Sequence, residues 1–255
     1  MVAQELKSAG FKVYAAARRV DRMADLEKDG ITPVALDLTR DGSIAACVNT
    51  ILSKEKSIDA LVNNAGYGSY GAIEDVPLEE GRRQFEVNLF GMARLIRLVT
   101  PAMWEQHYEK IVNISSMDGK IWTKFGGWYH ATKYAVEGLS DCLRMELQPF
   151  GIDVVVVEPG GIKTDWGLIA AENLKKTSTN GAYAEMANKA ADGMIKNYSG
   201  DLLSKPALIA KTVRKAVTKR RPRTRYLVGF GAKPMVWTHR LFGDRVFDWV
   251  LRTFS

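Results

Sequence analysis

The chain has 255 residues, of which 46% are hydrophobic and 25% charged, a composition typical of a globular protein with one sizeable core. It has no apolar run of about 18 residues, and its start lacks the basic-then-apolar secretory pattern, which argues against a membrane-spanning or exported protein. Its two cysteines and three histidines show no metal-ligand spacing, so we expect no metal, no disulfide framework and a reducing, cytoplasmic compartment.

The net charge is +7, and much of the excess lies in the stretch KTVRKAVTKRRPRTR at residues 211–225. It has no interleaved aromatic residues and no nucleic-acid module, so we interpret it as a solvated helix end and loop and expect no nucleic-acid partner. The predicted helical segment 233–252 is aromatic, apolar and basic together, as helices at membrane surfaces are. A peripheral membrane contact through this C-terminal region stays open, beside packing on the core or over a substrate pocket.

Apolar runs rich in β-branched residues alternate along the chain with longer segments of helical composition. Gly10 ends the first predicted helix, and Gly151 ends the long helix that begins near Trp128. This alternation predicts an α/β fold, a doubly wound parallel sheet in three αβα layers that forms one domain over residues 1–255. The predicted strands are 12–18, 32–38, 58–64, 110–116, 152–159 and 225–230.

Ligands of such sheets bind at the carboxyl ends of the strands. The residues that follow the predicted strands are polar, small or turn-forming, which suits a crevice where backbone approaches a ligand. These positions are 18–19, 37–39, 63–66, 115–116 and 159–161.

One G-x-G-x-x-G pattern, formed by Gly66, Gly68 and Gly71, follows a predicted strand. The dinucleotide-binding version opens directly into a helix and reaches a second strand within about 30 residues. Here Pro77 marks a new helix start, and the next predicted strand begins at Lys110. We therefore reject this match as a pyrophosphate loop.

The segment WYHATKYAVEG places Tyr129 and Lys133 four residues apart on one face of a predicted helix. A nearby ammonium favours the phenolate and lowers the pKa of a phenol from about 10, which allows proton transfer near neutral pH. Ser116, thirteen residues before Tyr129, ends a predicted strand and can hold a substrate carbonyl oxygen at the same point. For the Tyr–Lys pair alone, two neighbouring surface residues are the simpler interpretation.

Five motifs follow one another along the chain: NNAG (63–66), VNLFG (87–91), NISS (113–116), YHATK (129–133) and PGGIKT (159–164). In type, order and spacing they resemble those of the short-chain dehydrogenase/reductase family, from residue 1 to about 170. The resemblance is to members with a single Rossmann-like domain, and more weakly to hydroxysteroid-dehydrogenase-like members. It implies an enzyme that transfers a hydride between a nicotinamide cofactor and a ketone or secondary alcohol.

The resemblance implies a role for each catalytic position. Tyr129 is the general acid in reduction and the base in oxidation. Lys133 lowers the pKa of that phenol and holds the nicotinamide ribose. Ser116 orients the substrate oxygen, and Asn88 anchors a water in the proton relay.

The resemblance also implies the cofactor contacts, which all lie just after a predicted strand. They are Asp37 and Leu38 with adenine, Asn63, Ala65 and Gly66 with the adenosine ribose, and Pro159, Ile162 and Thr164 with the nicotinamide.

Arg18 ends the first predicted strand, where an acidic residue would bind the ribose 2′-hydroxyl of NAD and an arginine suits a 2′-phosphate. Because no Asp or Glu follows this strand before Asp21, we predict NADP rather than NAD. A solvated arginine at a strand end is the alternative.

The family places a strand and a glycine-rich turn, T-G-x-x-x-G-x-G, before a helix that MVAQELKSAG resembles. That strand pairs between the strands that end here at Arg18 and Asn64, so we expect unpaired backbone groups on both sides of a gap. In the interpretation we favour, the sequence is part of a longer, working reductase, since the later catalytic positions are intact. In the other, it is a shortened, non-catalytic binding protein or scaffold.

Aromatic residues gather in the segments that would wall a substrate pocket, namely Trp122, Phe125, Trp128 and Trp166. They predict a bulky apolar ketone or secondary alcohol, such as a steroid, retinoid or acyl-chain carbonyl. Packing in the core or against a second subunit is the alternative for each. Residues 165–200 are predicted to form a mobile helical lid, and the family resemblance suggests a homodimer or homotetramer.

Overall fold

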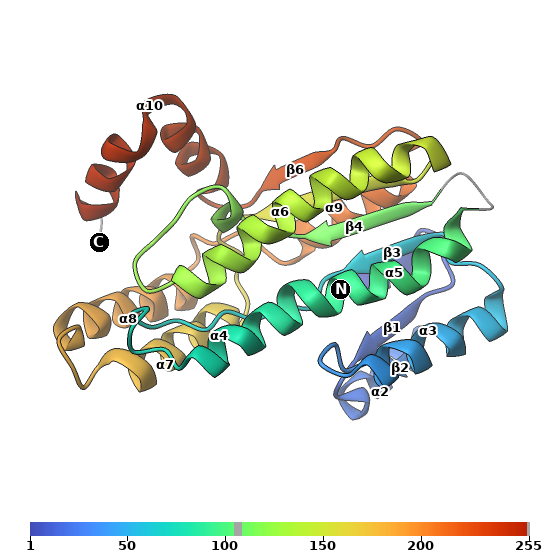
Figure 1. Ribbon diagram of the computed structural model, residues 1–255, viewed down its shortest axis with the longest axis horizontal. Coiled ribbons are helices and arrows are strands. Elements are labelled where there is room, and N and C mark those ends of the chain that lie inside the picture. The colour runs from blue at the N-terminus through green and yellow to red at the C-terminus, as the bar shows by residue number, and fades with distance from the viewer. Residues whose placement is uncertain (105–108, 254–255) are drawn as a thin grey trace.

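The computed structural model describes residues 1–104 and 109–253, in which parallel strands alternate with helices in three layers (Figure 1). Each strand of this part of the chain lies inside a predicted run and is shorter than it. The α/β prediction is therefore confirmed. The strands are β1 Tyr14–Ala17, β2 Thr32–Ala35, β3 Ala60–Asn63, β4 Lys110–Ile114, β5 Asp153–Pro159 and β6 Arg225–Val228.

The helices α1, α3, α5, α6 and α9 pack on the strands, and α7 and α8 form the segment predicted as a lid. Gly10 and Gly151 follow α1 and α6 with φ values of 93° and 74°, left-handed conformations that favour glycine and confirm both predicted helix ends. The helices are α1 Val2–Ser8, α2 Ala24–Lys28, α3 Asp41–Glu55, α4 Leu78–Phe85, α5 Gly91–Met103, α6 Gly127–Leu147, α7 Trp166–Ser178, α8 Ala184–Ser199, α9 Ala207–Thr218 and α10 Ala232–Thr253.

Shorter helical turns join several of these elements. A π-helical turn, η2 (Glu86–Phe90), links α4 to α5, and the 3₁₀ turn η3 (Met117–Gly119) follows β4. Two further 3₁₀ turns are η1 (Val20–Met23) and η4 (Gln148–Phe150).

The strands form two parallel sheets, β1-β2 and β3-β4-β5-β6. In the larger sheet Val112 of β4 lies between Val62 of β3 and Val155 of β5. Within the described residues no ladder joins β1 to β3. The gap expected between the strands that end at Arg18 and Asn64 is therefore present.

Alternate residues of the larger sheet face two separate hydrophobic clusters. Ile111 and Val154 belong to the cluster beneath α3, α5 and α6, whereas Val112 and Val155 pack toward α1 and α9 on the other face. Side chains that point to opposite faces in turn are the expected result of the two-residue period of a strand. Burial on both faces explains the run of four valines in β5.

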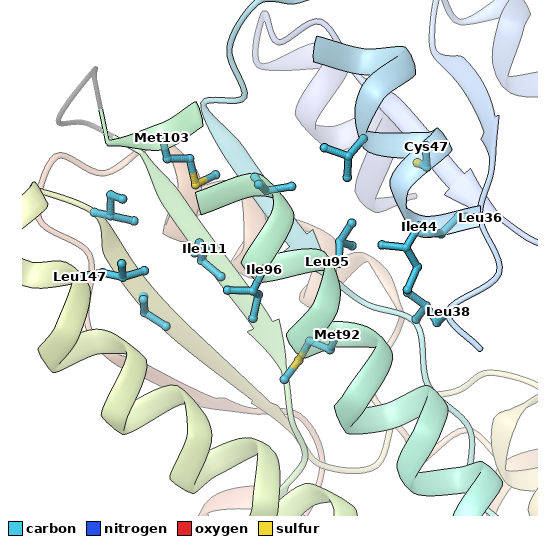
Figure 2. Packing of buried hydrophobic residues seen from close by; sticks show 14 of the residues in the cluster. Leu36, Leu38, Ile44, Cys47, Met92, Leu95, Ile96, Met103, Ile111 and Leu147 are labelled. Carbon is cyan, nitrogen blue, oxygen red and sulfur yellow. The ribbon is translucent and has the colours of Figure 1, made fainter. Parts of the chain in front are cut away.

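The first cluster also crosses the gap between the two sheets. Figure 2 shows Leu36 and Ile44 on one side of it, close to Leu95 of α5, with Ile111 of β4 beyond. Each buried side chain of this size contributes about 1.5–3 kcal/mol. Packing of α3 on α5 on one face, and of α1 on α9 on the other, therefore holds the two-stranded sheet against the larger one without a ladder.

The carboxyl ends of β4 and β6 point toward the side of the molecule where α7, α8 and α10 lie (Figure 1). The predicted segment 233–252 corresponds to α10, which is interrupted at Gly243 with a φ of 75°. In the described part of the chain, no helix combines the length and apolarity that a bilayer crossing requires. The same residues contain no group of three His, Cys, Asp or Glu side chains that could hold a metal ion.

Candidate active site

Helix α6 carries Tyr129 and Lys133 one turn apart, and both side chains are buried against the end of the sheet. The Lys133 ammonium lies 5.7 Å from the centre of the Tyr129 ring. It donates a hydrogen bond of 2.9 Å to the carbonyl of Ile114, the last residue of β4. This bond ties the catalytic face of α6 to the carboxyl end of a central strand.

Ser116 lies just beyond the same strand and caps the turn η3. Its Oγ accepts a hydrogen bond of 3.1 Å from the backbone N–H of Asp118. A hydrogen bond between Ser116 and Tyr129 is among the influences on the phenol pKa, which brings the two hydroxyls together. The structure therefore gathers Ser116, Tyr129 and Lys133 in one place.

Asn88 lies in the π-helical turn η2, a type of distortion that often marks functional sites. Its amide donates to the carbonyl of Tyr67 at 2.9 Å and to Thr132 Oγ1 at 3.1 Å, and its carbonyl oxygen accepts from the backbone N–H of Tyr67 at 3.1 Å. Asn88 thus anchors the loop after β3 to α6, one residue before Lys133. Its part in a water relay stays a prediction.

Burial governs the acid–base properties of the pair on α6. It raises the pKa of Tyr129, the charge of Asp118 raises it further, and the hydrogen bond to Ser116 acts in the opposite direction. Burial also lowers the pKa of Lys133 to about 8. The expectation that Lys133 brings the phenol pKa below its ordinary value is wrong for this structure, because the loss of water around the phenolate dominates.

The residues expected to contact adenine lie just beyond β2, and Arg18 lies exposed just beyond β1. Asp37 accepts hydrogen bonds from the backbone N–H and the hydroxyl of Thr39, at 3.0 and 2.7 Å, and these bonds lower its pKa. Leu38 is buried, and its carbonyl would lie 2.5 Å from a Cβ placed on Gly91. The glycine thus allows α5 to approach the end of β2.

The loop NNAG (63–66) begins with a buried, hydrogen-bonded asparagine and ends with exposed residues. Asn63 donates to Asn113 Oδ1 at 2.8 Å and is buried, whereas Ala65 and Gly66 are exposed. A Cβ on Gly66 would lie 3.2 Å from Asn88 Oδ1 and 3.7 Å from Lys133 Nζ. The absent side chain leaves room beside Lys133, which fits the close approach of a ribose or nicotinamide ring.

The motif PGGIKT follows β5 and leads into the lid. The carbonyl of Pro159 lies 3.4 Å from Ser116 Oγ. Ile162 is half-buried and forms a β-bridge with Ser204. Thr164 is exposed two residues before α7. Of the three residues expected at the nicotinamide, Pro159 is thus the one with a contact to Ser116.

The predicted aromatic walls separate into two groups. Trp166, the first residue of α7, covers Tyr129 with 4.9 Å between ring centres, and Phe125 packs on Tyr183 at 6.2 Å. Trp122 packs instead on Phe247 of α10, with ring centres 5.3 Å apart.

Trp128 also lies outside the enclosure of Tyr129. It packs on Phe85 of α4 at 6.4 Å. Trp122 and Trp128, which were expected to wall the pocket, therefore pack against neighbouring helices instead.

The sequence analysis missed a polar network beside Ser116. The backbone N–H of Thr123 donates to His130 Nε2 at 3.0 Å, so that this nitrogen is an acceptor. The proton of the neutral ring is therefore assigned to Nδ1, which lies 3.1 Å from the carbonyl of Asp118. The only sequence signal was that Asp118 stands two positions after the serine.

A second cluster that was missed lies behind α6. Glu137 and Glu158 are buried together, and the guanidinium of Arg225 lies 3.1 and 3.2 Å from their respective carboxylates. Lys120 lies 2.9 Å from Glu137. Arg225 also pairs with Asp141 at 2.6 Å, so this end of the basic stretch is part of the packed structure and not a solvated loop.

The comparisons with known proteins agree with this geometry. The family model described as short chain dehydrogenase matches residues 1–174. The chain belongs to the short-chain dehydrogenase/reductase family. It is 33% identical to a probable short-chain type dehydrogenase/reductase, VdlC, of Helicobacter pylori, over 97% of this chain and 90% of that protein.

Two solved structures extend this family relationship. A short-chain dehydrogenase from Streptomyces avermitilis is 32% identical, with a TM-score of 0.80 over 94% of this chain and 87% of that one. A metagenomic short-chain oxidoreductase in complex with NADP is 26% identical, with a TM-score of 0.63 over 89% of each chain. This member of the family is thus an oxidoreductase of CH–OH and C=O groups that uses a nicotinamide cofactor.

Glu158 makes the stability of this dehydrogenase depend on pH. Burial and the neighbouring Glu137 raise the pKa of Glu158 to about 7 in the folded protein. The folded state keeps a proton that the unfolded state releases, so the free energy of unfolding should fall as the pH rises from about 4.5 through 7. In Glu158→Gln this loss should shrink by about 1 kcal/mol, equivalent to about 2–4 °C in melting temperature.

Thermal unfolding between pH 5 and pH 8.5 measures this effect, with Glu146→Gln as the control because Glu146 is exposed on α6, the helix that carries Glu137. Parallel pH curves for the wild type and Glu158→Gln would contradict the assignment.

Proposed function

We propose that the protein reduces a bulky apolar ketone with NADPH. The observation that carries the proposal is the buried Tyr129 phenol beside Ser116. Because burial raises the pKa of Tyr129, the phenol is protonated at neutral pH and suited to give its proton to a developing alkoxide. This favours reduction over alcohol oxidation.

Each catalytic side chain has a separate task in this proposal. The hydroxyl of Ser116 donates to the ketone oxygen and orients it, and Tyr129 protonates that oxygen as it gains charge. Lys133, with a pKa of about 8, is mostly an ammonium at pH 7 and holds the ribose hydroxyls. The nicotinamide, when bound, supplies the hydride. Asn88 anchors the loop beside the site and a water in the relay.

Positive charge near the end of β1 supports NADP over NAD. Arg18 and Arg40 both act on the pKa of Asp37, and Arg18 and Arg83 both act on that of Tyr67. Arginines from three segments thus contribute positive charge near the ends of β1 and β3, and such charge favours a 2′-phosphate. The relative that is solved in complex with NADP gives independent support. The other proposed cofactor contacts are Asp37, Leu38, Asn63, Ala65, Gly66, Pro159, Ile162 and Thr164.

The aromatic enclosure supports an apolar substrate such as a steroid, retinoid or acyl-chain ketone. Tyr70 and Trp166 flank Tyr129, with ring centres 6.1 and 4.9 Å away. Trp166 begins the helical pair α7–α8, so withdrawal of this pair would uncover the phenol. We therefore keep the segment 165–200 as a lid that opens to admit the ketone and closes to exclude water.

Tyr129→Phe tests the proposed chemistry. The variant keeps the ring and its packing but lacks the proton, so kcat for ketones with NADPH should fall by about 10²–10⁴. The dissociation constant for NADPH, followed by fluorescence titration, should change by less than about threefold. An unchanged kcat would refute proton transfer by Tyr129. Saturable NADPH binding without turnover of any ketone in the wild type would favour the non-catalytic binding protein.

Arg18→Ala tests the cofactor preference. Loss of a charged hydrogen bond to the 2′-phosphate should raise KM for NADPH about 10- to 100-fold and leave KM for NADH nearly unchanged. Arg22→Ala is the matched control, since it removes an exposed arginine four residues away. Equal effects of Arg18→Ala on the two cofactors would argue against the 2′-phosphate contact.

We also propose that the protein forms a homodimer or homotetramer, which the family relationship supports. The free cysteines Cys47 and Cys142 support a reducing, cytoplasmic compartment. A membrane contact through α10 is a second proposal for a partner. Its supporting observations are Phe242 and Trp249, 63% and 64% exposed, and the neighbouring basic side chains. Those basic residues are Lys233, Arg240, Arg245 and Arg252.

Sedimentation with phosphatidylserine-containing vesicles tests this contact. Phe242→Ser should lower binding about 10-fold, because the buried ring contributes about 1.5–3 kcal/mol. Leu202→Ser, which removes a 71% exposed side chain outside α10, is the control. Equal binding by both variants and the wild type would exclude α10 as the membrane contact.

A further inference from the structure

A carboxylate that the proposed reaction does not use lies beside the catalytic serine. Asp118 Oδ2 is 3.2 Å from Ser116 Oγ, and the Asp118 side chain is only 13% exposed. Because the backbone N–H of Asp118 already donates to Ser116 Oγ, the serine proton is the one that can point to the carboxylate. In this structure Asp118 and Ser116 are therefore joined by two hydrogen bonds, one through the backbone N–H of Asp118 and one through its carboxylate.

The serine hydroxyl has a single proton, and two acceptors already compete for it. They are Asp118 Oδ2 at 3.2 Å and the carbonyl of Pro159 at 3.4 Å. A ketone oxygen that binds at Ser116 takes this proton for itself. Asp118 Oδ2 then loses its donor, and a buried acceptor without a donor is costly.

The surroundings of Asp118 do not replace that donor. Within residues 1–104 and 109–253, no lysine or arginine forms an ion pair with Asp118. His130 Nδ1 lies 4.0 Å from Asp118 Oδ1, and its proton points to the backbone carbonyl of the same residue. Lys133 donates to Ile114 instead. The other titratable groups whose pKa values respond to this carboxylate are Tyr70, Tyr129, Tyr134 and Tyr198.

We propose that Asp118 is a specificity-determining residue that binds a hydrogen-bond donor on the carbon next to the substrate carbonyl. The donor is a hydroxyl or an ammonium group. This inference rests on the proposed ketone reduction and narrows its substrate to α-hydroxy or α-amino ketones.

Simple geometry favours the adjacent carbon. A ketone oxygen lies about 2.8 Å from the serine oxygen, and a donor lies about 2.8 Å from the carboxylate oxygen that it contacts. The serine and carboxylate oxygens are 3.2 Å apart. If the two hydrogen bonds run side by side, the donor lies roughly 3 Å from the ketone oxygen, a spacing that groups on neighbouring carbons reach.

Three matched ketones test the inference, namely dodecan-2-one, 1-hydroxydodecan-2-one and 1-aminododecan-2-one, each assayed with NADPH at pH 7. The readout is the ratio of kcat/KM for each substituted ketone to that for dodecan-2-one. In the wild type at least one ratio should be about 10 to 100. In Asp118→Ala both ratios should fall to within about threefold of one.

Asp118→Asn separates charge from hydrogen bonding and covers the case in which the alanine variant fails to fold. The amide oxygen still accepts a hydrogen bond, so a preference for the hydroxyl should largely persist, whereas a preference for the ammonium should be lost. Asp248→Ala is the control. Asp248 of α10 accepts a hydrogen bond of 3.0 Å from Trp122, which lies on the same loop as Asp118. It should keep the wild-type ratios.

A merely structural role of Asp118 would lower kcat/KM for all three ketones equally and leave the ratios intact, which would overturn the inference. Wild-type ratios near one, with dodecan-2-one reduced, would overturn it as well while ketone reduction stands. Failure of the wild type to reduce any of the three would instead refute the proposed reduction of acyl-chain ketones, and this inference with it.

Discussion

The hydrogen bond from the Lys133 ammonium to the carbonyl of Ile114 holds the catalytic face of α6 against the end of β4. A buried ammonium must have such a partner, since an unpaired one would be costly in this environment. From the same strand end the chain continues to Ser116, and one turn back along α6 stands Tyr129. The relative positions of these groups therefore depend on one contact between a side chain and a strand carbonyl.

Burial fixes the positions of these side chains and also sets the pKa values of Tyr129 and Lys133. The dense packing that orders Tyr129 removes water from its oxygen, which raises the pKa of the phenol and keeps it protonated. The same burial lowers the pKa of Lys133 to about 8 without removing most of its charge at neutral pH. A neutral acid beside a largely charged ammonium suits the proton delivery to an alkoxide that we propose. Movement of Trp166 away from Tyr129 would change both values by readmitting water.

Much of the fold could be predicted from the sequence because strand and helix periods alternate regularly, and because Tyr129 and Lys133 have helical spacing beside a strand that ends near Ser116. The direction of the Tyr129 pKa could not be predicted, since spacing shows which groups are neighbours but not how deeply they are buried. The contacts of Asp118 with Ser116 and His130 were also missed. They depend on the fold of a single loop, in which isolated polar residues have no periodic pattern.

The two ends of the proposed dinucleotide site lie on different sheets of the described residues. Arg18 and Asp37 follow the strands of the smaller sheet, whereas Lys133 contacts the larger one. One bound molecule would thus contact both sheets, whose mutual orientation depends on the contact of α3 with α5 and on that of α1 with α9. Once one half of the dinucleotide is bound, the effective concentration of the other half at its own subsite would depend on that orientation. Side chains between these helices would then tune cofactor affinity from a distance, although none of them touches the cofactor.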